Sequence, residues 1–153
     1  MAGQVHDLAG RRVYVCAADG PSLAEDRNLS DLVGELMAVD LGAGKIVWRV
    51  PLGSLEELAP GVGHIAKGSI VLGGPIVTAS GLIFQGGTMD RTLRAFSAET
   101  GKQLWSGELP ASAHATPMTY QAGGKQYVAI AAGGSAKIDE ERQGDAIVAY
   151  ALP

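Results

Sequence analysis

The stretch Ala38-Val-Asp-Leu-Gly-Ala-Gly-Lys-Ile-Val-Trp48 decides the fold, because the chain contains a second copy of it. It aligns without gaps on Ala95-Phe-Ser-Ala-Glu-Thr-Gly-Lys-Gln-Leu-Trp105, 57 residues further along (38 to 95). Alanine, glycine, lysine and tryptophan recur in identical register. A repeat at a fixed spacing indicates that the chain is built from similar structural units.

Each copy has the pattern of a β-hairpin. An apolar strand end, Leu36–Val39 in the first copy, leads into a polar turn, where Gly44 or Gly101 takes the position that needs a positive φ. A second short strand carries Trp48 or Trp105, and one indole can bury a large area against a neighbouring sheet. The hairpin would join the third and fourth strands of a blade, because the repeat is close to the spacing of four-stranded propeller blades.

The remaining strands are predicted from short apolar runs between glycine, proline and polar turns. They form groups of three, four and three, listed in chain order: Arg12–Ala18, Glu35–Asp40 and Lys45–Leu52; Gly74–Thr78, Leu82–Gly86, Thr92–Ser97 and Lys102–Glu108; Ala115–Tyr120, Gln126–Ala131 and Ala146–Leu152. The sequence therefore predicts an all-β protein, a partial β-propeller of about two and a half four-stranded blades.

The strand groups also predict how the chain is divided. Residues 1–53 would form a partial blade and the start of a linker, 70–109 a complete blade, and 110–153 a final blade of three strands. A closed propeller has at least about four blades, so unpaired strand edges are expected at both ends. We therefore expect the remaining blades to be the partner of this chain. In closed propellers the missing outermost strand is often donated by the other terminus.

Composition and charge exclude several classes of protein. The net charge is −4 and no basic stripe is present, which argues against a nucleic-acid partner. A single cysteine, Cys16, excludes an internal disulfide. The longest apolar runs are about six residues, against the roughly 20 of a membrane-spanning helix, so we expect neither a transmembrane segment nor a signal peptide in this chain.

Few residues suggest chemistry by their spacing alone. Cys16 lies in an apolar run, which predicts a buried structural thiol. His6, His64 and His114 lack the spacing of metal ligands, and His114 is expected to be a hydrogen-bonded loop residue. The charge run Asp139-Glu-Glu-Arg142 is expected to be a solvated loop.

The segment Gly86-Gly-Thr-Met-Asp90-Arg91 is the most informative one. It follows a predicted buried strand, and its two glycines permit close approach of the backbone to another group. Taken alone, it fits either a simple hairpin or a contact with a ligand.

From Gly68 to Pro153 the sequence resembles a known family. The matching stretches include Gly73-Gly-Pro-Ile-Val-Thr-Ala-Ser-Gly-Leu-Ile-Phe84, Gly87-Thr-Met-Asp90, Thr100-Gly-Lys-Gln-Leu-Trp105, Leu109-Pro-Ala-Ser-Ala-His-Ala-Thr-Pro-Met-Thr-Tyr120, and Gly144-Asp-Ala-Ile-Val-Ala-Tyr-Ala-Leu-Pro153. They are similar to the C-terminal part of the quinoprotein dehydrogenases, which depend on pyrroloquinoline quinone (PQQ). The branch that they resemble most is the membrane-bound glucose dehydrogenases.

The resemblance implies an eight-bladed parent propeller that carries PQQ and a divalent cation, usually Ca²⁺, on its axis. Such enzymes oxidise a sugar or an alcohol and pass the electrons to a quinone or a cytochrome. They work in the periplasm or at the periplasmic face of the inner membrane. The catalytic aspartate and most cofactor and cation ligands of the family would lie upstream. We therefore assign no catalytic or metal-binding residue here and expect this chain alone to bind neither cofactor nor cation.

One residue carries over from the family as a cofactor-binding candidate. Asp90 matches an aspartate near the axial face of the penultimate blade, where it would either fix its loop by pairing with an arginine or orient a cofactor contact or a substrate hydroxyl. Ser135 stands where some glucose dehydrogenases have a histidine, so a role tied to that histidine does not transfer. The segment Asp19–Gly34 also departs from the family pattern.

Three functions remain open from the sequence. The first is a C-terminal fragment of a PQQ dehydrogenase that is inactive alone. The second is a non-catalytic propeller module that acts as a scaffold. The third is one half of a split quinoprotein enzyme whose upstream half is a separate polypeptide.

Overall fold

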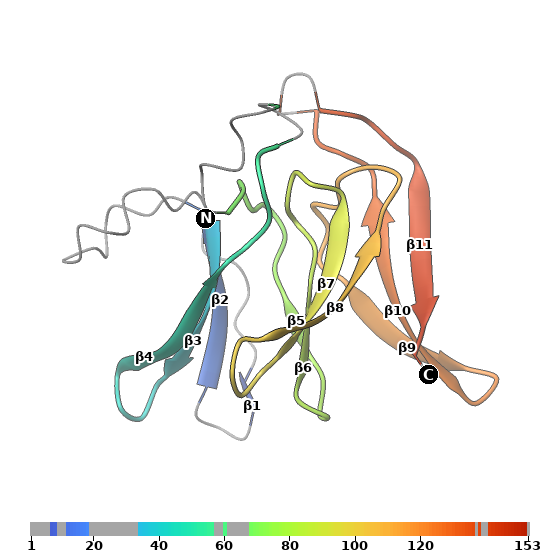
Figure 1. Cartoon of the computed structure of the whole chain (residues 1–153). Helices are drawn as coiled ribbons and strands as arrows, with labels where there is room; N and C mark the ends of the chain where they lie inside the picture. Colours follow the sequence, from blue (N-terminus) through green and yellow to red (C-terminus); the bar gives the residue numbers. More distant parts are fainter. Residues whose placement is uncertain are drawn as a thin grey trace.

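The structure is a computed structural model, and it describes residues 7–8, 12–18, 34–56, 60, 68–136, 138 and 141–152 (Figure 1). Within these residues it contains eleven β-strands in three antiparallel sheets and no helix. The predicted all-β partial propeller is therefore confirmed.

The strands of each sheet are neighbours in chain order. The first sheet has the order β1 (Asp7–Leu8), β2 (Arg12–Ala18), β3 (Gly34–Asp40) and β4 (Lys45–Pro51). The second has the order β5 (Ile76–Val77), β6 (Leu82–Gln85), β7 (Thr92–Ser97) and β8 (Gln103–Glu108). The third contains β9 (Met118–Ala122), β10 (Lys125–Ala132) and β11 (Ala146–Ala151), with β10 in the middle.

The predicted grouping of ten strands as three, four and three is wrong in its first member, since β1 makes that sheet four-stranded. The two residues of β1 form no apolar run, and only their pairing with Val13 and Arg12 of β2 defines them as a strand. Strand β9 also ends at Ala122, two residues beyond its predicted end at Tyr120. The turn is shorter because Gly123 and Gly124 both have positive φ and reverse the chain by themselves.

The repeat in the sequence is a repeat in strand register. Ala38 pairs with Trp48 and Ala95 with Trp105, and in both hairpins the pairing then shifts by one residue. The turn glycines Gly44 and Gly101 have φ of 61° and 71°. The eleven-residue unit therefore specifies the same bulged hairpin twice.

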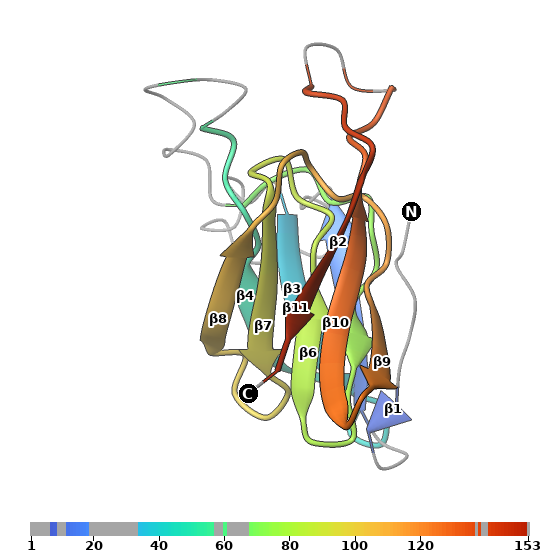
Figure 2. The same cartoon turned by 90° about the vertical axis from the view of Figure 1, so that its right-hand side faces the viewer.

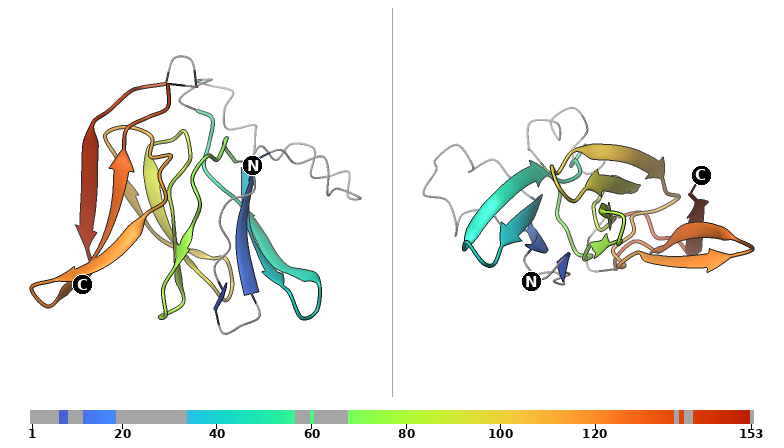
Figure 3. Two further views of the ribbon diagram at one scale, coloured as in Figure 1. Left: turned by 180° about the vertical axis from the view of Figure 1, so that it is seen from behind. Right: turned by 90° about the horizontal axis from the view of Figure 1, so that it is seen from below.

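The three sheets lie side by side in chain order, and the middle sheet is covered on both faces (Figures 1 and 3). Along β6, successive side chains point to opposite faces of the sheet. Ile83 joins a core cluster with Tyr14 and Leu36 of the first sheet, while Phe84 joins a second cluster with Val128 of the third. Burial on both faces of one sheet is the packing expected between propeller blades.

Both tryptophans contact the following sheet, as predicted. The Trp48 indole nitrogen donates a hydrogen bond to the Ala98 carbonyl oxygen at 3.2 Å. Trp105 packs edge-to-face against Tyr150 of β11, with ring centroids 4.9 Å apart. Figure 2, which looks onto the third sheet, shows β11 at the edge of this sheet that is turned toward β8.

Candidate functional site

The loop between β6 and β7, Gly86–Arg91, is packed tightly against its neighbours. A Cβ on Gly87, whose φ is 82°, would lie 2.8 Å from the Gly73 nitrogen. A Cβ on Gly86 would lie 2.5 Å from Cδ1 of Ile130 in the third sheet. The close approach predicted from the two glycines is therefore confirmed, and within the described chain it is an approach to protein atoms.

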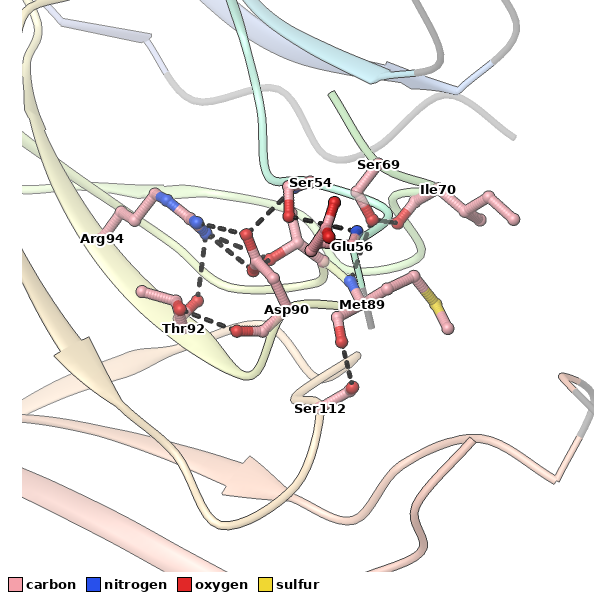
Figure 4. Close-up of polar contacts among 10 residues, drawn as sticks. Ser54, Glu56, Ser69, Ile70, Met89, Asp90, Thr92, Arg94 and Ser112 are labelled. Carbon is pink, nitrogen blue, oxygen red and sulfur yellow. Dashed lines mark hydrogen bonds and ion pairs between the residues drawn. The ribbon is translucent and has the colours of Figure 1, made fainter. Parts of the chain in front are cut away.

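Two buried serines hold the backbone of this loop at Met89 (Figure 4). The Met89 N–H donates to Ser69 Oγ at 2.9 Å, and the Ser112 hydroxyl donates to the Met89 carbonyl oxygen at 3.0 Å. Ser69 lies just before the second sheet and Ser112 just before the third. The loop is therefore a junction between segments that enter two different blades.

Asp90 connects the same loop to the first sheet. Its Oδ2 accepts a hydrogen bond from the Ser54 N–H at 3.0 Å and forms an ion pair with Nη2 of Arg94. Its Oδ1 accepts from the Thr88 hydroxyl at 2.7 Å and from Nη1 of Arg94 at 3.1 Å. The Asp90 and Arg94 side chains are each only 13% exposed. Segments that follow β4 and β6 thus meet at one carboxylate.

These contacts agree with the loop-fixing alternative for Asp90. An ionised carboxylate offers about four acceptor positions on its two oxygens, and four donors of the chain itself already point to them. Any cofactor group that approached Asp90 directly would have to displace or share one of these donors.

Arg91, the next residue, has a strained backbone. Its φ is 48°, and it is the one non-glycine residue with a positive φ in the described part of the chain. Its carbonyl oxygen accepts a hydrogen bond from the Leu109 N–H at 2.8 Å. Strain of this kind persists where the surroundings hold the backbone, and it is often found at functional sites.

A second polar pair fixes the loop between β10 and β11. His114 Nε2 and Glu141 Oε1 are 2.7 Å apart, and Glu141 Oε2 accepts a hydrogen bond from the Ser135 N–H at 2.6 Å. The side chains are 10% exposed for His114 and 3% for Glu141. The Gly134 N–H also donates to the Ser112 carbonyl oxygen at 2.8 Å. Through Ser112, this loop is connected to the loop that carries Asp90.

The prediction of a hydrogen-bonded loop histidine at position 114 is confirmed. The prediction of a solvated charge run is wrong for Glu141, because its carboxylate finds two partners inside the fold. Asp139 and Glu140 of the same run, His6, His64 and most of Asp19–Gly34 lie outside the described residues.

The other candidates behave as structural residues. Cys16 is buried, as predicted, and its burial raises the pKa of the thiol to about 12. In the part of the chain that the structure describes, no three His, Cys, Asp or Glu side chains form a group that could hold a metal ion. The described residues also contain no helix with the length and hydropathy needed to cross a bilayer.

Sequence reasoning found Asp90 but missed most of the contacts that hold its loop. The pairing of Asp90 with an arginine was one of the expected alternatives, and the structure identifies the partner as Arg94, four residues further along the chain. Ser54, Ser69 and Ser112 carry no such signal, since they are 36, 20 and 23 residues away from their partners in the sequence. Glu141 was hidden inside a run of charges.

Similar proteins support one family. The sequence profile of the β-propeller domain of PQQ-dependent glucose, ethanol and alcohol dehydrogenases matches residues 31–128, more than half of the chain. The quinoprotein glucose dehydrogenase of Escherichia coli (strain K12) is 43% identical over 124 residues, which are 78% of this chain and 16% of that protein. A probable quinate dehydrogenase (quinone) of Xanthomonas campestris pv. juglandis is also 43% identical, over 126 residues with the same coverage.

A solved structure agrees with these sequences. The quinohemoprotein alcohol dehydrogenase from Comamonas testosteroni superposes with a TM-score of 0.56 and 31% identity, over 76% of this chain and 16% of that one. The chain thus spans about a sixth of the length of the relatives that it matches. We conclude that it belongs to the β-propeller family of PQQ-dependent glucose, ethanol and alcohol dehydrogenases.

Proposed function

We propose that this chain is the C-terminal part of a PQQ-dependent dehydrogenase that oxidises a sugar or an alcohol, and that it is inactive alone. The observation that carries the proposal is its 43% identity to a quinoprotein glucose dehydrogenase of which it spans only 16%. In this proposal residues 1–53 are a partial blade with the start of a linker, 70–109 a complete blade, and 110–153 the final blade.

The size of the hollow beside Asp90 supports inactivity of the isolated chain. This hollow has a volume of about 170 Å³ and is lined by Asp90, Arg91, Thr92, Glu108 and Leu109. Sites for ligands of drug or cofactor size usually have about 300–1,000 Å³. A cofactor at this face would therefore need walls from other blades, and the chain alone is proposed to hold neither PQQ nor Ca²⁺.

Asp90 is proposed to belong to the cofactor-facing surface of the parent. Bound PQQ would supply the electron-accepting chemistry, while this chain would supply a rigid part of the wall. Because the Asp90 carboxylate already has four donors, we propose that it acts by holding Arg94 and the Gly86–Arg91 loop in place. The buried hydrogen bonds from the Met89 backbone to Ser69 and Ser112 also hold that loop against its neighbouring segments.

The partners in this proposal are the remaining blades, a sugar or alcohol substrate, and a quinone or cytochrome acceptor. A relative named for glucose and one named for quinate are both 43% identical to this chain. Sequence identity in this region therefore does not indicate which substrate the parent oxidises. The proposed location is the periplasm or the periplasmic face of the inner membrane. A nucleic-acid partner is not proposed, because the chain has a net charge of −4.

The test of inactivity is a turnover assay. The purified chain is mixed with PQQ, Ca²⁺, glucose or a simple alcohol, and an artificial electron acceptor. We expect no turnover above the no-protein control, and any such turnover would contradict the proposal. Turnover that appears only when the upstream blades are added as a separate polypeptide would identify a split enzyme. If the chain changes no turnover of any added blades, the scaffold function would be favoured.

The test of Asp90 uses Asp90→Asn in the intact parent, with Asp40→Asn as a matched control. Asp40 accepts a hydrogen bond from the Ala43 N–H in an exposed turn, far from the junction. We expect Asp90→Asn to lower kcat/KM at least tenfold, about 1.4 kcal/mol in transition-state terms, and Asp40→Asn to leave it unchanged. If Asp90→Asn lowers the melting temperature but leaves kcat/KM unchanged, Asp90 is a purely structural residue and is no longer a candidate site residue.

A further inference from the structure

The segment Leu109–His114 connects the second sheet with the third and is bonded to the Gly86–Arg91 loop along its length. Three hydrogen bonds join this connecting segment to the loop: Gly87 N–H to the Ala113 carbonyl oxygen at 2.6 Å, the Ser112 hydroxyl to the Met89 carbonyl oxygen at 3.0 Å, and Leu109 N–H to the Arg91 carbonyl oxygen at 2.8 Å. Its central residues, 111–113, are almost completely buried. A displacement of the connecting segment would therefore displace the loop that carries Asp90.

The loop between β10 and β11 is anchored on the same connecting segment. The Gly134 N–H donates to the Ser112 carbonyl oxygen at 2.8 Å, while the Ser112 hydroxyl donates to Met89. A Cβ on Gly144 would lie 2.8 Å from the Ala111 Cβ, so the backbone at the end of this loop also rests on the segment. The two loops are therefore linked through one buried serine.

One pair of side chains fastens the β10–β11 loop to the connecting segment. Glu141 Oε1 lies 2.7 Å from Nε2 of His114, the last residue of the segment, and its Oε2 accepts from the Ser135 N–H at 2.6 Å. His114 Nδ1 is buried and has no hydrogen-bond partner among the described residues. The position of the ring within the described chain thus depends on its single bond to Glu141, because a buried polar atom without a partner does not stabilise that position by itself.

The chemistry of this pair requires a carboxylate. An ionised carboxylate only accepts hydrogen bonds, and here its two oxygens face two different N–H donors. Glutamine would offer one acceptor oxygen, and its NH₂ group would face one of these donors. Moving the ring proton of His114 to Nδ1 would not repair this, since an N–H there would be buried without an acceptor among the described residues.

We propose that His114 and Glu141 are positioning residues of the parent dehydrogenase. By fixing the β10–β11 loop on the connecting segment, they hold the Gly86–Arg91 loop, and with it Asp90, in the cofactor-facing surface. The inference rests on the proposed function, in which Asp90 belongs to that surface. The pair acts through Ser112 and its neighbours, not through contact with cofactor or substrate.

The test uses four variants that differ in what they leave of this pair. Glu141→Gln removes one acceptor oxygen, and His114→Leu removes the ring donor. His114→Gln is the conservative variant, because its amide N–H can still donate to the carboxylate. Asp145→Asn is the matched control, since it removes the charge of an exposed residue in the same loop. Glu141→Asp, which keeps both acceptor oxygens on a shorter side chain, replaces Glu141→Gln if that protein does not fold, and should act in the same direction.

Amide hydrogen exchange of this chain, without cofactor or substrate, is the first readout. We expect the first two variants to speed exchange of the Gly134 and Gly87 amides at least about tenfold, because both amides donate to carbonyl oxygens of the connecting segment. Exchange at Gly101, whose N–H donates within the β7–β8 turn, should not change. The conservative variant and the control should exchange like the unchanged chain. If only Gly134 is affected, the pair holds nothing beyond its own loop and the proposal is wrong.

Kinetics of the intact parent, saturated with PQQ and Ca²⁺, are the second readout. We expect Glu141→Gln and His114→Leu to lower kcat and kcat/KM equally, by at least about threefold, because a displaced Asp90 loop weakens interactions made in the transition state. His114→Gln and the control should retain most of the activity. A lower melting temperature with unchanged kcat, or equal losses for His114→Gln and His114→Leu, would overturn the proposal.

The two readouts separate this inference from the proposed function. An active parent in which Glu141→Gln changes neither exchange nor kcat overturns the positioning role alone. A parent with intact wild-type exchange but no turnover on any sugar or alcohol overturns the proposed function, and the positioning role with it.

Discussion

The interface around Trp48 and the interface around Trp105 begin from the same hairpin and end with different degrees of burial. Trp48 donates a hydrogen bond to Ala98 and lies directly over Gly101, where an added Cβ would come within 2.6 Å of the indole. Trp105 packs against the edge of Tyr150, is 37% exposed, and donates no hydrogen bond to another described residue. An identical local motif therefore does not ensure an identical interface.

The difference teaches that each blade is completed by the blade that follows it. The hairpin sets the register and the direction of its tryptophan. The residues that cover the tryptophan lie in a turn of the next blade: Ala98 and Gly101 cover Trp48, three and six residues after Ala95. The second sheet supplies this turn to the first, and the described part of the third sheet does not supply it to the second. Stability should accordingly be concentrated at the first interface.

Truncation of the tryptophans should separate the two interfaces most strongly. We expect Trp48→Ala to lower the free energy of unfolding by about 3–5 kcal/mol, the usual cost of truncating a packed tryptophan. Trp105→Ala should cost about 1–2 kcal/mol in this chain, because less apolar area is lost. Urea unfolding measures both. In the intact parent we expect Trp105→Ala to cost about 3–5 kcal/mol, the usual figure for a buried tryptophan.

The turn glycines give a smaller and sharper contrast. Gly44 and Gly101 have nearly the same φ, but a Cβ would meet nothing within 4 Å at Gly44 and would clash with the Trp48 ring at Gly101. Gly44→Ala should therefore cost about 1 kcal/mol from backbone strain alone. Gly101→Ala should cost about 1–3 kcal/mol more, because the indole must move. Equal costs in the same urea series would show that Trp48 does not rest on this turn.

Two tyrosine hydroxyls test the polar part of the comparison. Tyr14 is buried at the first interface and donates to the Ala98 carbonyl oxygen at 3.1 Å, while Tyr150 donates to the Glu108 carbonyl oxygen in a more exposed setting. Tyr14→Phe should cost about 1 kcal/mol, in the range of a net intramolecular hydrogen bond. We expect Tyr150→Phe to cost less than half of that. The reverse order would mean that the second interface is the better-ordered one.

Cys16, in the core of the first interface, makes no pH-dependent contribution to stability near neutral pH but gives stability a pH dependence in alkali. Burial raises the thiol pKa to about 12 from its ordinary value of 9.0, so the folded state favours the protonated thiol. The unfolded chain binds fewer protons between these values, and stability should therefore be constant below about pH 9 and fall as the pH rises toward 12. Cys16→Ser should remove this slope, and a thiol reagent at pH 8 should react with Cys16 only on unfolding.

The sequence predicted the fold well because the information lies in local spacing. The hairpin unit around Trp48 and Trp105 fixes turn, register and face within eleven residues, and its repeat identifies the blade. Strand β1 escaped prediction because its two residues are a strand only through their partners on β2. The ends of β5 and β9 shifted for a similar reason, since pairing across the sheet decides where a short strand stops.

The candidate site was less predictable because its contacts join distant segments. Asp90 was found through the family resemblance, and the pair with Arg94 is local enough to be anticipated. The serine contacts to the Asp90 loop and the contact between His114 and Glu141 bring together residues 20–36 positions apart. Such contacts depend on how blades stack, and no spacing rule within one blade contains that information.

Fluorescence of the two tryptophans tests the central claim most directly, because the chain contains only these two. Trp105→Phe leaves Trp48 as the single emitter, and Trp48→Phe leaves Trp105. We expect Trp48 to emit at shorter wavelength and to be quenched by acrylamide at least twofold less efficiently than Trp105, since Trp48 packs over Gly101 and bonds to Ala98, whereas Trp105 is 37% exposed. Equal emission and equal quenching of the two variants, both still folded, would contradict the account.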